Sequence, residues 1–340
     1  MVHLMTYEIT IRPSGQTFQA NDNESILDAA LRHGFALPHG CRNGACGSCK
    51  GKLLSGHVKY PAATPVCLRP EDLAANIQAF CQACPTSAIA IEVAEIGATK
   101  DITIKTLPCR VQKMDKLASD VMRLMLRLPS AEIFNFLPGQ YIDILLKEGK
   151  KRSFSIANAP QPNNQLELHI RLIENGFFTQ QVFNEMQEKA LLRFEGPFGN
   201  FFLREDSQRP IIFIAGSTGF APIKSILEDA FQSSCTRQMH LFWGVKHREL
   251  LYLDTIPAAW QKKYANFHYT PVLSEPADSD QWQGATGLVH QQVLSQFHDL
   301  ANYDIYASGP PALIQAITSD FSAHGLQSEQ FYFDAFDFNS

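Results

Sequence analysis

The chain has 340 residues, and 45% of them are hydrophobic, which is enough for two or three packed domains. Its formal net charge is −5 and no acidic or basic tail is present, so the composition argues against nucleic acid as a partner. The longest apolar stretches are too short for a membrane span, and the N-terminal residues lack the order of a signal peptide. These features predict a cytoplasmic multi-domain protein without membrane insertion.

The first hundred residues contain short strand and helix signals. Tyr7–Arg12 and Thr17–Ala20 alternate like a strand pair around the turn residues Pro13-Ser14-Gly15. Apolar spacing predicts a helix over Glu24–His33, with Asn23 as its cap. The later elements are expected to be a strand at 51–58, a short helix within 70–78 and a strand at 88–93.

The cysteines of this region have an informative spacing. Cys41, Cys46 and Cys49 follow the pattern C-x4-C-x2-C, and Cys81 and Cys84 lie further along the chain. This spacing is typical of a plant-type 2Fe-2S cluster, whereas zinc prefers paired C-x2-C knuckles and core cysteines need apolar periodicity around them. The residues alone leave Cys81 and Cys84 as alternatives for the fourth ligand.

The order of elements around this loop resembles plant-type ferredoxins, which have a β-grasp fold, over about residues 1–95. The resemblance assigns the fourth ligand to Cys81 and leaves Cys84 unliganded. We expect a ferredoxin domain at 1–97. The other cysteines are expected to be ordinary buried thiols: Cys67, Cys109 and Cys235.

The second region consists of strands with no long helix between them. Strands are expected at 102–105, 121–128, 141–146 and 166–173. An antiparallel barrel of about six strands is the natural closure, because closing the sheet removes its exposed edges. We expect this domain to span 102–206.

Two short motifs in the barrel region suggest a binding site. Arg152-Ser-Phe-Ser155 lies on an expected strand, and Gly176-Phe-Phe-Thr179 opens an expected helix. An arginine and a helix N-terminus together favour a diphosphate group, although each motif alone is also compatible with an ordinary strand edge or turn. In this order, they resemble the flavin-binding motifs of the ferredoxin-NADP reductase superfamily, Arg-x-Tyr-Ser and Gly-x-x-Ser.

The resemblance implies a role for each matching residue. Arg152 would bind the flavin phosphate, Phe154 would pack on the flavin, and Ser155 would form a hydrogen bond near N5. The remaining flavin contacts would come from His169, Ile170 and Arg171 along the ring, and from Gly176, Phe178 and Thr179 at the diphosphate. Phe154 keeps the aromatic face of the usual tyrosine without its hydroxyl.

From Pro210 onward the pattern alternates between strand and helix. Ile211–Ala215 is a continuous apolar run, as in a buried parallel sheet. Further strands are expected at 239–243, 267–272 and 304–307, and helices at 223–231, 289–297 and 312–321. The alternation predicts a doubly wound α/β domain, at 207–340, which binds ligands at the carboxyl ends of its strands.

Two loops at these strand ends match superfamily motifs. Gly216-Ser-Thr-Gly-Phe-Ala-Pro222 resembles Gly-x-Thr-Gly-x-x-Pro, which implies pyridine-nucleotide contacts from Gly216, Thr218, Gly219 and Pro222. Ser308-Gly309-Pro310-Pro311 resembles the Cys-Gly-Pro-Pro motif beside the nicotinamide, with Ser308 in place of cysteine. Relatives cover the flavin with a terminal aromatic side chain, and Phe336 is the candidate here, although the aromatic C-terminus is also compatible with core packing.

The positive residues after the second strand of this domain bear on nucleotide preference. Lys246, His247 and Arg248 lie where a 2′-phosphate would be bound, but such charges commonly belong to a solvated loop. We therefore expect NADH as the donor, with NADPH possible.

Across the full chain, the order of domains resembles three-domain NAD(P)H reductases with an N-terminal ferredoxin domain, in particular the CDP-6-deoxy-3,4-glucoseen reductase type and the reductase components of oxygenases. The resemblance implies electron transport from NAD(P)H through FAD and a 2Fe-2S cluster to a partner oxygenase or deoxysugar dehydrase, with Ser155, Ser308 and Phe336 nearest the reacting atoms. The alternative is an iron-sulfur flavoprotein that acts as a redox sensor or binding protein and has no dedicated turnover partner.

Overall fold

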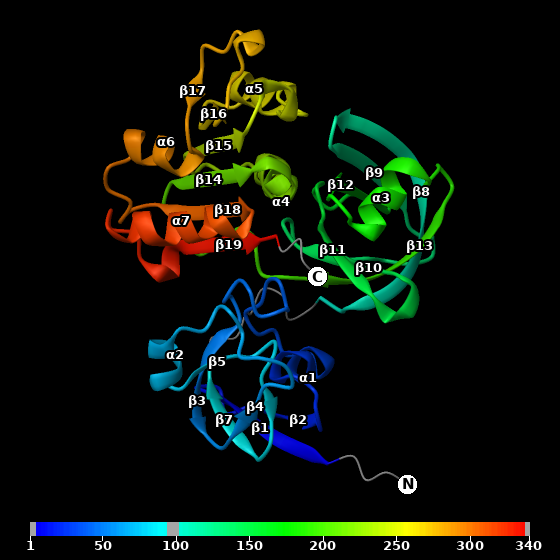
Figure 1. Ribbon diagram of the computed structural model, residues 1–340, viewed down its shortest axis with the longest axis vertical. Coiled ribbons are helices and arrows are strands. Elements are labelled where there is room, and N and C mark those ends of the chain that lie inside the picture. The colour runs from blue at the N-terminus through cyan, green and yellow to red at the C-terminus, as the bar shows by residue number, and fades with distance from the viewer. Residues whose placement is uncertain (1–4, 94–101, 337–340) are drawn as a thin grey trace. The chain divides into compact units, whose positions relative to one another are not determined.

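The computed structural model describes residues 5–93 and 102–336 (Figure 1). The chain divides into two compact units, one ending at Thr103 and the other beginning at Ile104. The second unit contains both an antiparallel barrel and a parallel α/β sheet.

The first unit has a β-grasp sheet with strand order β2-β1-β7-β3-β5 and a separate β4-β6 ladder. Its strands are β1 (Thr6–Arg12), β2 (Thr17–Asn21), β3 (Lys50–Ser55), β4 (Val58–Lys59), β5 (Ile77–Ala79), β6 (Cys84–Pro85) and β7 (Ile89–Glu92), and its helices are α1 (Ile26–Arg32) and α2 (Pro70–Ala74). The hairpin β1-β2 is antiparallel, as expected, and β7 joins β1 in parallel.

Two local expectations for this unit are wrong. The cap of α1 is Ser25, whose Oγ accepts a hydrogen bond from the backbone N–H of Asp28 at 3.0 Å, and Asn23 lies in the preceding turn with φ +62°. The strand expected at 51–58 ends at Ser55, because Gly56 has φ +85° and turns the chain. Asn23, expected as a helix cap, and Gly56, expected inside a strand, therefore both lie in turns.

The barrel of the second unit has strand order β11-β10-β13-β8-β9-β12, and every pair is antiparallel. Its elements are β8 (Lys105–Ala118), β9 (Val121–Arg127), β10 (Tyr141–Leu145), β11 (Lys151–Ser155), β12 (Gln165–Arg171), α3 (Phe177–Asn184) and β13 (Leu191–Phe198). A bridge between Ile156 and Leu168 closes the sheet. The expected six-stranded barrel is confirmed.

The first barrel strand differs from the expectation. A strand was expected at 102–105, whereas β8 begins at Lys105 and continues for 14 residues. Its first half alternates buried Leu107, Cys109 and Val111 with exposed neighbours, which is the pattern of a strand with one face on a core. The second half of β8 is mostly polar, so the alternation of apolar residues does not continue along the strand and its length is not evident from the sequence.

The α/β half has six parallel strands in the order β17-β16-β15-β14-β18-β19. The strands are β14 (Ile211–Gly216), β15 (Met239–Val245), β16 (Phe267–Leu273), β17 (Ala285–Thr286), β18 (Asp304–Gly309) and β19 (Phe331–Ala335), and the helices are α4 (Phe220–Gln232), α5 (Thr255–Lys263), α6 (Val289–Gln296) and α7 (Pro311–Ser322). Short 3-10 helices are η2 (Lys147–Gly149), η3 (Ser217–Gly219), η4 (Arg248–Leu250), η5 (Asp278–Asp280) and η6 (Ser328–Gln330). The strand order reverses between β14 and β18, and ligands bind α/β sheets at such a switch point.

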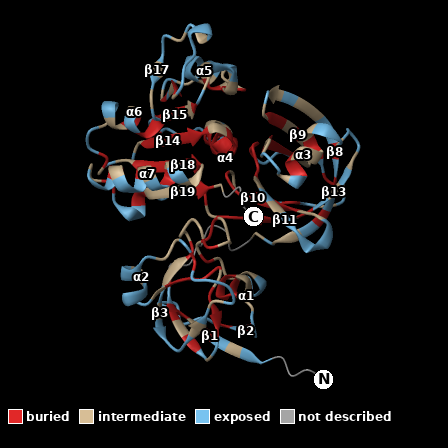
Figure 2. Cartoon of the chain, in the orientation of Figure 1, coloured by how far each residue is buried: buried red, intermediate tan, exposed pale blue. Residues whose placement is uncertain are grey.

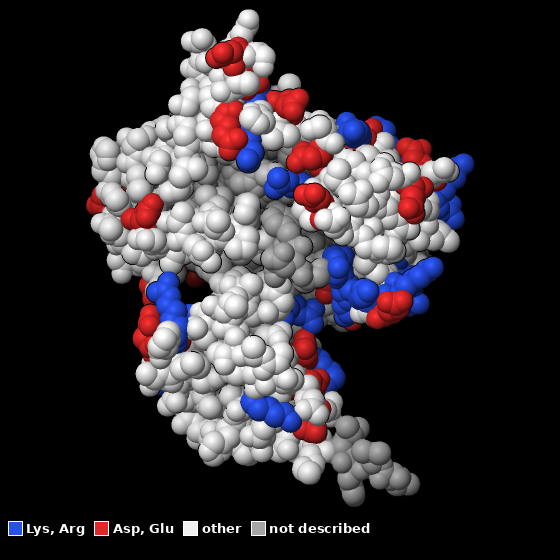
Figure 3. Space-filling model, in the orientation of Figure 1, with Lys and Arg blue, Asp and Glu red and all other residues white. Residues whose placement is uncertain are grey.

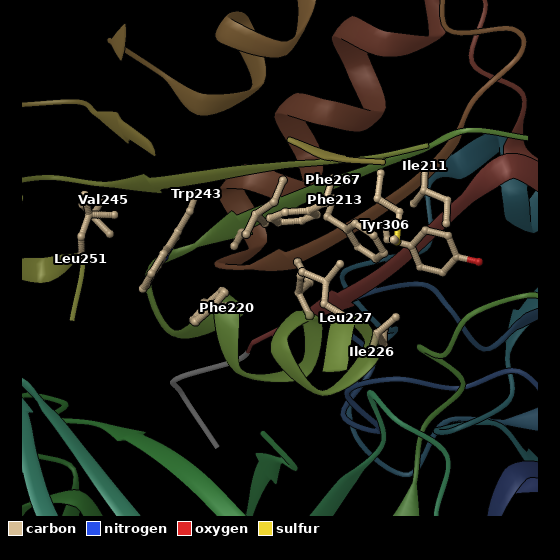
Figure 4. Close-up of a cluster of buried hydrophobic side chains, with 14 of the residues drawn as sticks. Ile211, Phe213, Phe220, Ile226, Leu227, Trp243, Val245, Leu251, Phe267 and Tyr306 are labelled. Carbon is tan, nitrogen blue, oxygen red and sulfur yellow. The ribbon is translucent and has the colours of Figure 1, made fainter. Parts of the chain in front are cut away.

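The core of the α/β half is aromatic. Phe220 of α4 stacks on Trp243 of β15, with ring centroids 4.1 Å apart, and Figure 4 shows both side chains between the sheet and the helix. Figure 2 shows that burial concentrates in β14, β15 and β18, while the outer faces of α5 and α7 are exposed. The sheet is therefore covered on both faces, as expected of a doubly wound domain.

The surface is mixed in charge. On the face drawn in Figure 3, Lys and Arg are interspersed with Asp and Glu. Within residues 5–93 and 102–336, no helix is long and apolar enough to cross a membrane.

Candidate functional site

Four cysteines come together in the first unit. Cys41, Cys46 and Cys49 lie on the loop between α1 and β3, and Cys81 follows β5. The backbone N–H of Cys41 donates to the Cys46 sulfur at 3.4 Å, and the N–H of Cys46 donates to the Cys41 sulfur at 3.3 Å. The Ser48 N–H also donates to the Cys46 sulfur, at 3.5 Å. These donors make the loop suited to hold thiolates.

The four sulfurs form two pairs. A hydrogen bond with Cys41 is the largest cause that lowers the pKa of Cys46, to about 6, and a hydrogen bond with Cys81 likewise lowers the pKa of Cys49. Cys84 belongs to neither pair: burial raises its pKa, and its thiol lies 3.9 Å from the Gln82 carbonyl oxygen. The structure thus brings Cys81, and not Cys84, to the other three cysteines.

This donor set fits a two-iron cluster. In the described part of the chain, no three His, Cys, Asp or Glu side chains are grouped so as to hold a single metal ion. Two thiolate pairs match the ligand need of a 2Fe-2S cluster, in which four cysteines serve two irons. Cys67 lies beside these ligands, since the charges of Cys49 and Cys46 contribute, after burial, to raising its pKa to about 11.

Strand β11 carries the expected flavin residues of the barrel. Arg152 donates to the Lys151 carbonyl oxygen at 2.8 Å and has no carboxylate partner within the described residues. The ring of Phe154 contacts that of Phe178, with centroids 5.5 Å apart. Ser155 Oγ is 3.0 Å from Asp334 Oδ2 of β19, and both residues are buried. The guanidinium of Arg152 remains available to a phosphate.

Strand β12 presents its main chain rather than its side chains. Ile170 is in the barrel core, and His169 is buried against Glu167 and Tyr252. Along its other edge, in the described residues, β12 pairs with β11 only near Leu168, so the main chain after that point has no strand neighbour. Arg171 binds Asp120, with Nε and Oδ2 3.1 Å apart. Any flavin contact from His169 and Ile170 is therefore made by backbone atoms.

The turn before α3 leaves helix N–H groups available. Gly176 is the N-cap residue and supplies no side-chain cap. Thr179 Oγ1 accepts from the Ile173 N–H at 3.1 Å and lies 3.1 Å from the Gly176 carbonyl oxygen, so its hydroxyl shapes the turn. Phe178 is buried in the barrel core. An anion at this site would meet the amide dipoles at the start of the helix.

The two expected nucleotide loops touch at the switch point. β14 and β18 are neighbours, with Ala215 opposite Ser308. A Cβ atom on Gly219 would overlap the carbonyl oxygen of Ser308, so these loops meet through their main chains. Thr218 is buried in η3, and Pro222 is buried in the first turn of α4. Gly216 and Pro310 also meet here, since a Cβ on Gly216 would lie 3.1 Å from Pro310 Cδ.

Ser308 lies at the end of β18, where the next residue, Gly309, is hydrogen-bonded to Phe336. Ser308 is fully buried, and its Oγ is one of the few buried side-chain atoms in the described residues without a hydrogen-bond partner. The backbone N–H of Phe336 donates to the Gly309 carbonyl oxygen at 2.9 Å. An orphaned hydroxyl where two glycine-containing loops meet fits a site for a polar ligand group.

Sequence reasoning missed Asp334. It lies 179 positions from Ser155, and its carboxylate accepts the hydrogen bond of Ser155 only because β19 is added to the end of the parallel sheet. The motif Phe333-Asp334-Ala335 offered no signal beyond an aromatic cluster.

Family models match three successive segments of the chain. These are a 2Fe-2S iron-sulfur cluster binding domain at residues 9–86, an oxidoreductase FAD-binding domain at 108–203 and an oxidoreductase NAD-binding domain at 213–319.

Curated relatives match over nearly the full length. The CDP-6-deoxy-L-threo-D-glycero-4-hexulose-3-dehydrase reductase of Yersinia pestis is 41% identical over 98% of this chain and 99% of its own. Terephthalate 1,2-dioxygenase reductase component 2 of a Comamonas species is 33% identical over 98% of both chains. This chain belongs to the family of iron-sulfur flavoprotein reductases.

A solved structure agrees with this membership. The Amycolatopsis cytochrome P450 reductase GcoB has a TM-score of 0.82 and 26% identity, over 97% of this chain and 99% of its own. The reductase is an NAD(P)H-dependent oxidoreductase whose cofactors are FAD and a 2Fe-2S cluster, and it passes electrons to a partner protein. The expected family, fold class, enzyme class and cofactors are confirmed.

Proposed function

We propose that this reductase carries electrons from NADH to a deoxysugar dehydrase in the cytoplasm. The observation that carries the choice of acceptor is the 41% identity, over 98% of the chain, to a reductase named for a CDP-6-deoxyhexulose dehydrase, against 33% for one named for terephthalate dioxygenase. Eight cysteines without a disulfide in the described structure are compatible with a reducing compartment.

The residues of the reductase would act by binding and orienting. When bound, FAD accepts a hydride from the nicotinamide and the 2Fe-2S cluster carries single electrons, so the protein itself needs no covalent nucleophile. Arg152 would bind the flavin phosphate by charge, and the start of α3 would add its amide groups. Ser155 donates its hydroxyl proton to Asp334 and would therefore present its oxygen to the flavin ring as an acceptor, while Ser308 would contact the nicotinamide.

At the cluster, the chain supplies thiolates and donors. Cys41 and Cys46 would bind one iron, and Cys49 and Cys81 the other, following the sulfur pairs. The N–H groups directed at the sulfurs would stabilise the added negative charge of the reduced state.

Preference for NADH is supported by the contacts of the basic residues after β15. Lys246 Nζ lies 3.1 Å from Glu275 Oε1, and Arg248 Nη1 donates to the Asp280 carbonyl oxygen at 3.0 Å. His247 Nδ1 is 2.6 Å from the Glu275 carbonyl oxygen. All three side chains are engaged by the next loop, which also adds a carboxylate where a 2′-phosphate would need positive charge.

The proposal is tested with purified, anaerobic holoenzyme. NADH should bleach the flavin and cluster absorption together, and NADPH should do so at least tenfold more slowly. With CDP-6-deoxy-L-threo-D-glycero-4-hexulose-3-dehydrase and its sugar substrate, NADH oxidation should accelerate; terephthalate 1,2-dioxygenase with terephthalate should give little acceleration. Equal or faster turnover with the dioxygenase would reject the proposed acceptor.

A variant without the cluster distinguishes electron transfer to the partner from flavin reduction by NADH. Cys46→Ser should lose the cluster and dehydrase-coupled turnover, yet keep NADH-to-ferricyanide activity because small oxidants react with the flavin directly. Cys235→Ser, in the α/β half, is the matched control and should retain both activities. Loss of ferricyanide activity in Cys46→Ser alone would contradict the modular mechanism.

A further inference from the structure

Four buried polar side chains connect the barrel to the α/β half of the second unit. They are Glu167 and His169 of β12, Lys224 of α4, and Tyr252, which follows η4; we call them the polar bridge. His169 Nδ1 is 3.0 Å from Tyr252 Oη, and His169 Nε2 is 2.9 Å from Glu167 Oε1. Lys224 Nζ donates to Glu167 Oε2 at 3.1 Å. The chain of contacts is continuous from Tyr252 to Lys224.

The direction of each hydrogen bond in the polar bridge follows from the charges. Burial lowers the pKa of His169 and raises that of Tyr252, so both are neutral near pH 7. Burial alone would raise the pKa of Glu167, but the hydrogen bond of His169 and the charge of Lys224 lower it to about 2. His169 therefore donates from Nε2 to the Glu167 carboxylate, and its Nδ1 accepts from the Tyr252 hydroxyl.

The side chain of Lys224 is only 5% exposed, and each proton of its ammonium group has an acceptor. Its three protons meet Glu167, Glu228 Oε1 at 2.8 Å and the carbonyl oxygen of Ala157 at 3.0 Å. Beside it on α4, Ser225 Oγ donates to the Asn158 carbonyl oxygen at 2.7 Å. Helix α4 is thus fastened to the segment that directly follows the flavin strand β11.

The far end of the polar bridge reaches the nucleotide turn. The rings of Tyr252 and Trp243 form a T-shaped pair, with centroids 5.1 Å apart. Trp243 Nε1 in turn donates to the carbonyl oxygen of Ser217 at 2.9 Å, and Ser217 has φ +52°. A line of contacts therefore runs from β12, through Tyr252 and Trp243, to the η3 turn between Gly216 and Gly219.

A contribution to folding stability does not by itself explain why the polar bridge is buried. A buried ion pair is often no more stabilising than well-packed apolar side chains of the same volume, whereas its directional contacts fix a geometry. Hydride transfer depends steeply on that geometry, because a displacement of about 1 Å costs on the order of a hundredfold in rate.

We propose that Glu167, His169, Lys224 and Tyr252 are positioning residues that hold the nucleotide turn at a fixed distance from the flavin-binding strands. Their side chains act through β12, the segment after β11 and Trp243, without touching either reactant. The proposal rests on the reductase activity and is independent of the acceptor proposed above.

Tyr252→Phe is the first test because it removes one hydroxyl and keeps the ring on Trp243. In anaerobic single-turnover experiments, flavin reduction by saturating NADH should slow about tenfold, with a larger primary isotope effect from NADH deuterated at the transferred position. The dissociation constant of NAD⁺ and the FAD content should change less than twofold. Tyr269→Phe removes a partly buried hydroxyl, bound to Asp254 Oδ1 at 2.7 Å in the same half, and should leave all these values unchanged.

A second readout does not depend on turnover. Amide hydrogen exchange in Tyr252→Phe and in Lys224→Gln should quicken at 157–159 and 216–219, whereas Tyr269→Phe should keep the wild-type pattern. Wild-type reduction rates and exchange in both bridge variants would overturn the proposal. A slower rate that saturating NADH restores, with a weaker NAD⁺ affinity, would also overturn it by showing a binding role.

Discussion

Ser308 stands where the nucleotide-loop motif Cys-Gly-Pro-Pro has its cysteine. Its hydroxyl is buried without a partner in the described structure, at the point where the two nucleotide loops meet. A buried polar group without a hydrogen bond costs stability, so its retention fits a contact made only with a ligand.

Ser308→Ala should therefore separate stability from activity. The melting temperature should stay the same or rise slightly, since no hydrogen bond is lost, while the limiting rate of flavin reduction by NADH should fall about three- to tenfold. Differential scanning fluorimetry and stopped-flow spectroscopy measure the two effects. A variant that keeps the wild-type rate would remove Ser308 from the site.

The cysteines allow an equally direct comparison. Cys81→Ser should lose the visible spectrum of the 2Fe-2S cluster, whereas Cys84→Ser should keep it, because only Cys81 contacts another member of the thiol group. Iron content and absorption of the two purified variants decide the matter. The reverse result would assign the fourth ligand to Cys84.

At the scale of elements, the close contact between η3 and the end of β18 governs the nucleotide site. Gly219→Ala places a methyl group against the Ser308 carbonyl oxygen, which neither main chain can avoid without separating the loops. We expect the KM for NADH to rise at least tenfold while the FAD content stays near wild type. Steady-state kinetics with ferricyanide and the flavin absorbance of the same preparation test this, and an unchanged KM would contradict the role of the turn.

Local patterns predicted most elements, and long-range contacts account for what they missed. The apolar runs of β14 and β15 predict buried strands from the sequence alone. Strand β19 is partly exposed and becomes a strand only by pairing with β18. The cysteine and glycine motifs could be recognised in the sequence, because each is defined by the spacing of its residues within one short loop. The bond from Ser155 to Asp334 and the polar bridge join distant positions, so no single segment contains their signal.

At the scale of the whole molecule, three hydrophobic cores lie within residues 5–93 and 102–336, centred on the β-grasp sheet, the barrel and the α/β sheet, and the last also takes in Val121 of the barrel. Each core lies mainly within one of the three segments that family models match separately. The domain limits expected from the sequence, at 97 and 206, stay predictions.

The α/β half should lose stability in acid for an identifiable reason. Burial, and then the charge of His268, lower the pKa of His240 from 6.5 to about 4. Below pH 6.5 the unfolded chain binds a proton that the folded protein does not, so the stabilisation is complete above that pH and is lost as the pH falls towards 4.

His240→Phe should therefore flatten the fall of the urea midpoint between pH 7 and pH 5. All three tryptophans lie in this half, so their fluorescence reports its unfolding: Trp243, Trp260 and Trp282. His298→Gln, at an exposed position of the same half, is the control and should follow the wild type. Parallel curves for all three proteins would exclude His240 as the cause.

The contact between Gly219 and Ser308 also bears on how this reductase can evolve. Gly219 meets a carbonyl oxygen, an atom that every amino acid carries, so the constraint falls on position 219 and spares the side chain at 308. In a library randomised at both positions and selected for nucleotide binding, survivors should keep glycine at 219 and vary among small side chains at the fully buried position 308. Replacement of the motif cysteine by serine is then an accessible evolutionary step, because the main-chain contact between the two loops is the same before and after it.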